Sequence, residues 1–160
     1  MTNNYYLPEP QRKNEKVWKF VHQKNFKYKT DVLKGREFDS EWLSISQKGK
    51  ITVKGKNGDG YAWDGCTPKV NKFDITWGNF DGKLIRFKPR DYKPMTYYAS
   101  MIHDVLYQYK SEAPVTRKEA DIIFKDMLEE VKFKWRRLFY LGVRWFGGSR
   151  KFGEWKHKNN

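Results

Sequence analysis

Four residues in the second half of the chain have the types and the spacing needed for acid–base chemistry. His103, Asp104 and Tyr107 stand close together in one segment, and Asp121 follows in the next. A carboxylate that fixes a histidine ring leaves the other ring nitrogen available as a general base. A second carboxylate beside that base can hold a hard cation. Together these groups have the chemistry to activate water for attack on an ester.

Two interpretations of these residues are open on the sequence alone. In the first, His103 is the base, Asp121 orients it, and Asp104 binds a cation; Ca²⁺ fits best because the ligands would be oxygens. In the second, the His–Asp pair only satisfies buried polar groups between two helices. Contact between the two side chains, and access of His103 to an open cleft, separate the two interpretations.

The residues ahead of this group have the patterns of β-strands. Apolar and polar residues alternate through 26–30 and 43–45, and the run 51–53 is β-branched. Glycine-containing turns separate these runs, and Asn57-Gly58 suits a type I′ turn. Strands followed by helices predict an α+β fold, with N-terminal antiparallel strands and then about three α-helices.

Helical spacing begins after Pro94. Apolar residues at positions 98, 101, 102, 105, 106 and 109 form one stripe, and His103 lies on its flank. Thr116 and Glu119 predict a capping box at the start of a second helix. A third helix is expected at about 135–146, before two glycines. If the first two helices are antiparallel, Asp121 reaches the His103 ring.

The length of 160 residues predicts a single domain at 16–148, with an N-terminal arm at 1–15 and a basic tail at 149–160. Cys66 is the only cysteine, which excludes an intramolecular disulfide and a thiolate metal cluster. No apolar run reaches the roughly 18–20 residues that cross a bilayer. We therefore expect a soluble protein without a transmembrane segment.

Positive charge dominates the composition. Lys and Arg number 33 against 19 Asp and Glu, a net charge of +14. Such a surplus attracts nucleic acid, an anionic membrane surface or an acidic protein, or else it is spread over the surface for solubility. The third helix interleaves basic and aromatic residues. This pattern suits a lipid or nucleic-acid interface, and equally a helix that buries its rings and solvates its charges.

Four strings occur in a fixed order along the chain: Tyr61–Pro68 (YAWDGCTP), Ile102–Tyr107 (IHDVLY), Thr116–Phe124 (TRKEADIIF) and Val143–Gly147 (VRWFG). This series resembles a phage-associated domain of unknown function (number thirteen fifty-three), over roughly residues 17–148. The resemblance implies a protein of tailed phages or prophages. It implies no particular activity, because none is established for that family.

The two central helices are also similar to the core of the phospholipase A2 superfamily, where a His-Asp-x-x-Tyr helix precedes an antiparallel helix whose Asp supports the His. His103, Asp104, Tyr107 and Asp121 occupy the matching places. The similarity implies calcium-dependent hydrolysis of lipid esters. His103 would activate water, Asp121 would orient His103, Tyr107 would support the network, and Asp104 would hold Ca²⁺.

The glycine-rich calcium loop of that superfamily has one candidate here, the segment 60–68. Within it, Asp64 and Gly65 are the expected Ca²⁺ ligands beside Asp104. Trp63-Asp64-Gly65 either lines a site opposite His103 or forms a turn anchored by the tryptophan, with Asp64 capping its own backbone.

Two classes of function follow. One is a bacteriophage enzyme, a calcium-dependent, phospholipase-like ester hydrolase that acts on membrane lipids during entry or lysis. The alternative is a non-catalytic virion or accessory structural protein whose basic surface contacts DNA, an acidic partner or other virion proteins. Either would be found in the host cytoplasm or incorporated in the virion.

Overall fold

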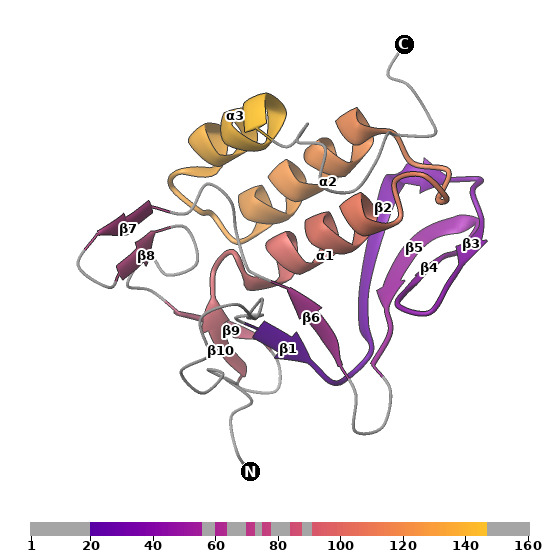
Figure 1. The fold of residues 1–160 in the computed structure, drawn as a ribbon, viewed down its shortest axis with the longest axis horizontal. Coiled ribbons are helices and arrows are strands. Elements are labelled where there is room, and N and C mark those ends of the chain that lie inside the picture. Colours follow the sequence, from indigo (N-terminus) through magenta and orange to yellow (C-terminus); the bar gives the residue numbers. More distant parts are fainter. Residues whose placement is uncertain are drawn as a thin grey trace, which may run out of the picture.

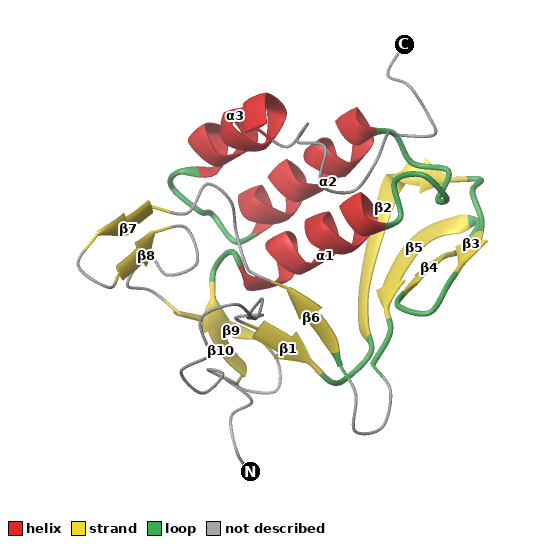
Figure 2. Ribbon diagram, in the orientation of Figure 1, coloured by secondary structure: helices red, strands yellow, loops and turns green. Residues whose placement is uncertain are grey.

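The computed structural model describes residues 20–55, 60–63, 70–72, 75–77, 84–87 and 91–146, and strands precede helices throughout this part of the chain (Figures 1 and 2). The strands are β1 (Phe20–His22), β2 (Phe26–Lys34), β3 (Phe38–Asp39), β4 (Leu43–Ile45), β5 (Lys48–Val53), β6 (Tyr61–Trp63), β7 (Val70–Lys72), β8 (Ile75–Trp77), β9 (Leu84–Phe87) and β10 (Asp91–Pro94). The helices are α1 (Tyr97–Gln108), α2 (Arg117–Glu130) and α3 (Arg136–Phe146). The predicted α+β class is confirmed.

All strand pairs that the structure describes are antiparallel, as expected from the turn-separated runs. The largest sheet has four strands in the order β2-β5-β4-β3, and the β2–β5 pair places Phe26 opposite Val53 and Tyr28 opposite Ile51. The other pairs are β1 with β6, β7 with β8, and β9 with β10. The predicted arm at 1–15, the Asn57-Gly58 turn and the tail at 149–160 lie outside the described residues.

Helix α1 is the centre of the core. It lies between the strands and α2, and α3 lies on the far side of α2 (Figure 1). Ten of its twelve residues are buried, so both the predicted apolar stripe and its flank are covered. His103, which the spacing predicted on the flank of the stripe, is buried, because the sheets and α2 close over α1 from different sides. None of the helices described is long and apolar enough to cross a membrane.

The start of α2 is fixed by the predicted capping box. Thr116 Oγ1 accepts a hydrogen bond from the Glu119 backbone N–H at 3.2 Å, and Glu119 Oε2 accepts one from the Thr116 backbone N–H at 2.8 Å. Both interactions satisfy amide groups that have no partner within the helix. Because the first turn is pinned in this way, Asp121 faces α1 from the second turn of α2.

Strand β6 is joined to α1 by a buried hydrogen bond. Trp63 Nε1 donates to Ser100 Oγ at 3.1 Å, and the indole has no exposed surface. Ser100 lies one turn before His103 and Asp104 on the same helix. The end of β6 is therefore held close to the helical turn that carries the candidate base.

Two glycines with positive φ give a matched test of sheet packing. Gly49 has φ 72°, and a Cβ there would lie 2.1 Å from the carbonyl oxygen of Thr30 in β2; Gly35 has φ 78° and nothing within 4 Å of such an atom. Alanine at either position pays roughly 1–2 kcal/mol for the left-handed conformation. At position 49 it must in addition displace a β2 carbonyl.

We therefore expect Gly49→Ala to lower the free energy of unfolding clearly more than Gly35→Ala does. Urea unfolding of the two variants beside the wild type measures the difference. Equal losses would mean that the close approach of β2 to the turn is not maintained in solution.

Candidate functional site

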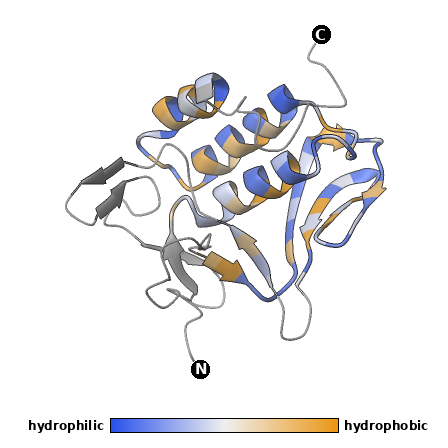
Figure 3. Cartoon of the chain, viewed as in Figure 1, coloured by the Kyte–Doolittle hydropathy of each residue, from blue (hydrophilic) through white to orange (hydrophobic). Residues whose placement is uncertain are grey.

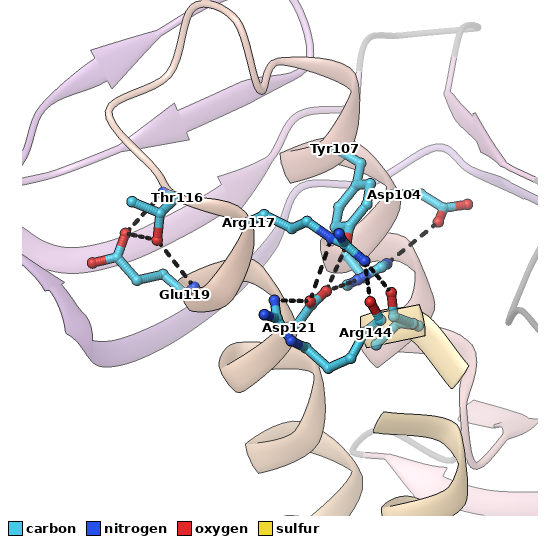
Figure 4. Close-up of polar contacts among 9 residues, drawn as sticks. Asp104, Tyr107, Thr116, Arg117, Glu119, Asp121 and Arg144 are labelled. Atoms are coloured by element: carbon cyan, nitrogen blue, oxygen red, sulfur yellow. Dashed lines mark hydrogen bonds and ion pairs between the residues drawn. The ribbon is translucent and has the colours of Figure 1, made fainter. Parts of the chain in front are cut away.

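His103 and Asp121 form a buried pair between α1 and α2. His103 Nε2 lies 2.9 Å from Asp121 Oδ1, so the predicted contact between these side chains is confirmed (Figure 4). The Asp121 side chain has no exposed surface and His103 is 7% exposed. Since the carboxylate accepts, Nε2 carries the proton and the second ring nitrogen, Nδ1, is left to face the other way.

Tyr107 completes the α1 side of this pair. Its hydroxyl donates to the same oxygen, Asp121 Oδ1, at 2.6 Å. Its ring lies against the imidazole with 4.1 Å between centroids, and Phe124 contacts the imidazole at 4.9 Å. Burial, and then the negative charge of Asp121, raise the pKa of Tyr107. The tyrosine therefore stays protonated and acts as a hydrogen-bond donor that helps to fix the histidine ring.

A third donor, Arg144 of α3, was not predicted from the sequence. Its Nη1 donates to the other oxygen, Asp121 Oδ2, at 2.9 Å, and Arg117 Nε lies 3.9 Å from that oxygen (Figure 4). The spacing of Arg117 and Asp121 along α2 is a recognisable signal. No spacing rule connects residue 144 with residue 121, because they lie on different helices.

Arg117 ties the three helices together around the pair. Its Nε donates to the Tyr107 hydroxyl at 3.4 Å, and its Nη2 donates to the Val143 carbonyl at 3.0 Å and to the carbonyl of Arg144. Those carbonyls belong to the last turn of α3, where a cation is favourable. The site is thus built from side chains of α1 and α2 and locked by the end of α3.

The electrostatics of the pair favour two opposite charges. Burial alone would raise the pKa of Asp121, but the hydrogen bond and charge of His103, with the bonds from Tyr107 and Arg144, hold it below its ordinary value. Burial alone would lower the pKa of His103, but the carboxylates of Asp104 and Asp121 outweigh burial and raise it. His103 is therefore more basic than an ordinary histidine.

Asp104 lies at the solvent side of the imidazole. Its Oδ1 is 3.9 Å from His103 Nδ1, and its side chain is 33% exposed. Tyr61 of β6 is close enough that, after burial, the charge of Asp104 also raises the tyrosine pKa. The Nδ1 side of His103 is therefore bordered by a carboxylate, and Tyr61 of β6 lies near that carboxylate.

The described residues supply one candidate Ca²⁺ ligand, the Asp104 carboxylate. Asp64 and Gly65, the other expected ligands, lie outside the described residues, although Trp63 directly before them is anchored to α1. No group of three or more His, Cys, Asp or Glu side chains in the described part of the chain is arranged to hold a metal. One carboxylate does not fit an ion that takes roughly six to eight oxygen ligands.

The opposite charges of His103 and Asp121 make stability depend on pH. A raised histidine pKa contributes stability that is complete below the ordinary value of 6.5 and is lost as pH rises through the raised pKa. The lowered Asp121 pKa contributes stability above 3.8 that is lost as pH falls through the lowered pKa. The pair should therefore stabilise the fold most between these two ordinary values.

We expect the free energy of unfolding of the wild type to fall as pH rises from about 6 to about 9. The difference between wild type and His103→Gln should shrink over the same interval, which separates His103 from the other titrating groups. Urea unfolding at a series of pH values measures both curves. A difference that stays constant over this range would show that His103 is not charged in the folded protein.

Comparison with known proteins gives one match. No curated protein and no solved structure matches the chain. Residues 89–143 match the family model described as "Protein of unknown function (DUF1353)". The matched stretch contains α1, α2 and α3 up to Val143, and so His103, Asp104, Tyr107 and Asp121. The match confirms the predicted resemblance to this family over residues 89–143, which contain the strings Ile102–Tyr107 and Thr116–Phe124.

Proposed function

We propose that this protein hydrolyses carboxylic esters, with His103 as general base and Asp121 as the residue that positions it. One observation carries the proposal. Asp121 binds Nε2 at 2.9 Å, which turns Nδ1 toward the partly exposed Asp104. An imidazole held by a buried carboxylate at one nitrogen, with the other directed to the solvent side, is the arrangement that general-base catalysis requires.

The attacking water, in this proposal, lies between His103 Nδ1 and Asp104 Oδ1. The 3.9 Å between His103 Nδ1 and Asp104 Oδ1 is too long for a hydrogen bond. A water about 2.8 Å from each atom would bridge them, with one proton directed at Nδ1. His103 and Asp104 would together orient such a water at the Nδ1 side of the imidazole ring.

In this reaction His103 both takes up the proton of the water and returns it to the leaving alcohol. The water oxygen bonds to the ester carbonyl carbon while Nδ1 takes the proton, which forms a tetrahedral intermediate and an imidazolium. Asp121, on Nε2, stabilises the imidazolium. When the intermediate collapses, the bond from carbon to the alcohol oxygen breaks, and Nδ1 returns its proton to that oxygen. The products are a carboxylic acid and an alcohol.

Membrane lipids in a bacteriophage context are the substrate that we propose. The similarity of the helix pair to the phospholipase A2 core supports a lipid ester. The resemblance to a phage-associated family supports a role in entry or lysis, in the host cytoplasm or the virion. The surplus of 33 Lys and Arg over 19 Asp and Glu supports contact with an anionic surface.

A second function, a non-catalytic virion or accessory protein, is favoured by a different observation. His103 is only 7% exposed, and each of its nitrogens faces a carboxylate. In that case the imidazolium is a permanent structural cation, and the basic surface contacts DNA, an acidic partner or other virion proteins. The two functions predict the same fold and differ only in turnover.

Calcium held by Asp104 together with Asp64 and Gly65 is part of the hydrolase proposal, although no step above depends on it. Binding to the folded state alone stabilises a protein by mass action. We therefore expect millimolar Ca²⁺ to raise the melting temperature of the wild type and to leave that of Asp104→Asn unchanged. Asp126→Asn, in α2, is the control for general charge effects. An unchanged wild-type melt, or equal shifts in all three proteins, would count against calcium at this position.

His103→Gln separates the base from the structural cation. The amide nitrogen of Gln can occupy the place of Nε2 and keep the bond to Asp121, but it provides no base. We expect a loss of about 10²–10⁴-fold in fatty acid release from anionic vesicles and from a short-chain soluble ester. The melting temperature should change by a few degrees at most, since the carboxylate keeps a donor.

Two controls make this result specific. His103→Ala strands the buried carboxylate and should cost roughly 3–5 kcal/mol of stability. His22→Gln replaces a histidine of β1 that contacts Tyr97, outside the site, and should retain turnover. A wild-type protein that releases no product from either substrate would exclude the hydrolase and leave the structural function.

A further inference from the structure

Helix α3 and the residue that precedes it carry four large apolar side chains in contact with solvent. Trp135 is 54% exposed, Leu138 57%, Leu141 42% and Trp145 74%. These are the exposed large hydrophobic residues of the part of the chain that the structure describes. We call them the α3 outer face.

The α3 outer face is distinct from the face that packs on the domain. Leu138, Leu141 and Trp145 follow at steps of three and four residues, so they line one side of the helix. Phe139 and Val143, on another side, are buried at 7% and 3% exposure. Figure 3 shows apolar and hydrophilic residues alternating along α3. One apolar side completes the core, and a second, equally apolar side remains at the surface.

Positive charge dominates the sequence around this face. Between Val131 and Gly153 the sequence contains no Asp or Glu. Two of the local cations are paired: Arg144 binds the buried Asp121 at 2.9 Å, and Arg136 lies 3.6 Å from the exposed Glu129. The exposed cations next to the face are Lys132, Lys134 and Arg137.

We propose that the α3 outer face inserts into an anionic lipid surface. Tryptophans at both ends with leucines between them suit the boundary between headgroups and acyl chains, where an indole keeps its N–H in a polar layer. Lysine and arginine at the border attract anionic headgroups, and the missing carboxylates remove the repulsion. Nucleic acid would be contacted through cations and stacked rings, and it gains nothing from two exposed leucines.

Docking through α3 places the lipid surface next to the candidate site. The same helix that presents Trp145 outward sends the neighbouring residue, Arg144, inward to Asp121. Trp145, which would contact the membrane, is therefore adjacent in sequence to Arg144, which binds the carboxylate that holds His103. This inference names the surface on which the proposed hydrolase works, but lipid binding itself does not need turnover.

Sedimentation with vesicles tests the surface directly. The full chain should pellet with phosphatidylglycerol vesicles and stay in the supernatant with phosphatidylcholine vesicles, and higher salt should weaken the binding. Leu138→Ser/Leu141→Ser should weaken binding by about tenfold or more, because two side chains no longer enter the apolar phase. Both residues are exposed, so the fold should melt at an unchanged temperature.

Matched variants separate apolar insertion from charge alone. Arg137→Gln, beside the face, should reduce binding more than Lys48→Gln, which removes the same charge from an exposed position of β5. The tryptophan emission of the wild type should shift to shorter wavelength on phosphatidylglycerol vesicles, and Trp145→Phe should lose part of that shift.

The outcomes distinguish this inference from the proposed activity. Equal binding of phosphatidylglycerol vesicles by the wild type and the double serine variant would overturn the insertion of α3. Turnover of a soluble ester without vesicle binding would overturn the docking surface and leave the hydrolase. Vesicle binding without turnover of any ester would overturn the hydrolase and leave the docking surface.

Discussion

The arrangement of the three helices depends on one carboxylate that has no contact with solvent. A buried charge is tolerated only where donors satisfy its oxygens, because its hydration is lost. Asp121 receives His103 and Tyr107 from α1 on one oxygen and Arg144 from α3 on the other. Helix α2 therefore presents its acid to both neighbours at once. Any shift of α1 or α3 along α2 would leave part of this carboxylate without a donor.

The first turn of the same helix is tied to the sheet. Arg36, which follows β2, donates to both carboxylate oxygens of Glu119 at 2.5 and 2.7 Å and to the Pro114 carbonyl at 2.8 Å. Glu119 also caps α2 through Thr116. The fork-to-fork geometry of an arginine and a carboxylate fixes orientation as well as distance. Because this pair and Asp121 are less than one turn apart, the sheet, the cap and the candidate site share one rigid segment.

This rigidity bears on both proposed functions. A general base is useful only when its ring cannot rotate. His103 is held by the Asp121 carboxylate and by the rings of Tyr107 and Phe124. The same constraints would serve a protein that uses an imidazolium only to fill its core. Two features lie outside this core: the partly exposed Asp104 beside Nδ1, and the exposed Trp135 and Trp145 at the ends of the α3 outer face. A histidine that serves only to fill the core would need neither of these two features.

Interactions between residues that are close in the sequence could be predicted from the sequence. Helical spacing placed α1 and α2, the Thr116–Glu119 box began α2 where it was predicted, and the short antiparallel connection brought Asp121 to His103. Calcium ligation by Asp64 and Gly65 stays a prediction, because these residues lie outside the described part of the chain.

What the tertiary structure alone decided is which side of each element is covered. Spacing put His103 on the flank of a stripe, but sheets and α2 enclose α1 from several directions, so the flank is buried. Spacing likewise cannot choose between the two apolar sides of α3: packing on α2 buries Phe139 and leaves Trp145 exposed. Arg144 reaches Asp121 only after that choice is made. Local propensity acts within about one helical turn, whereas burial depends on segments that are distant in the sequence.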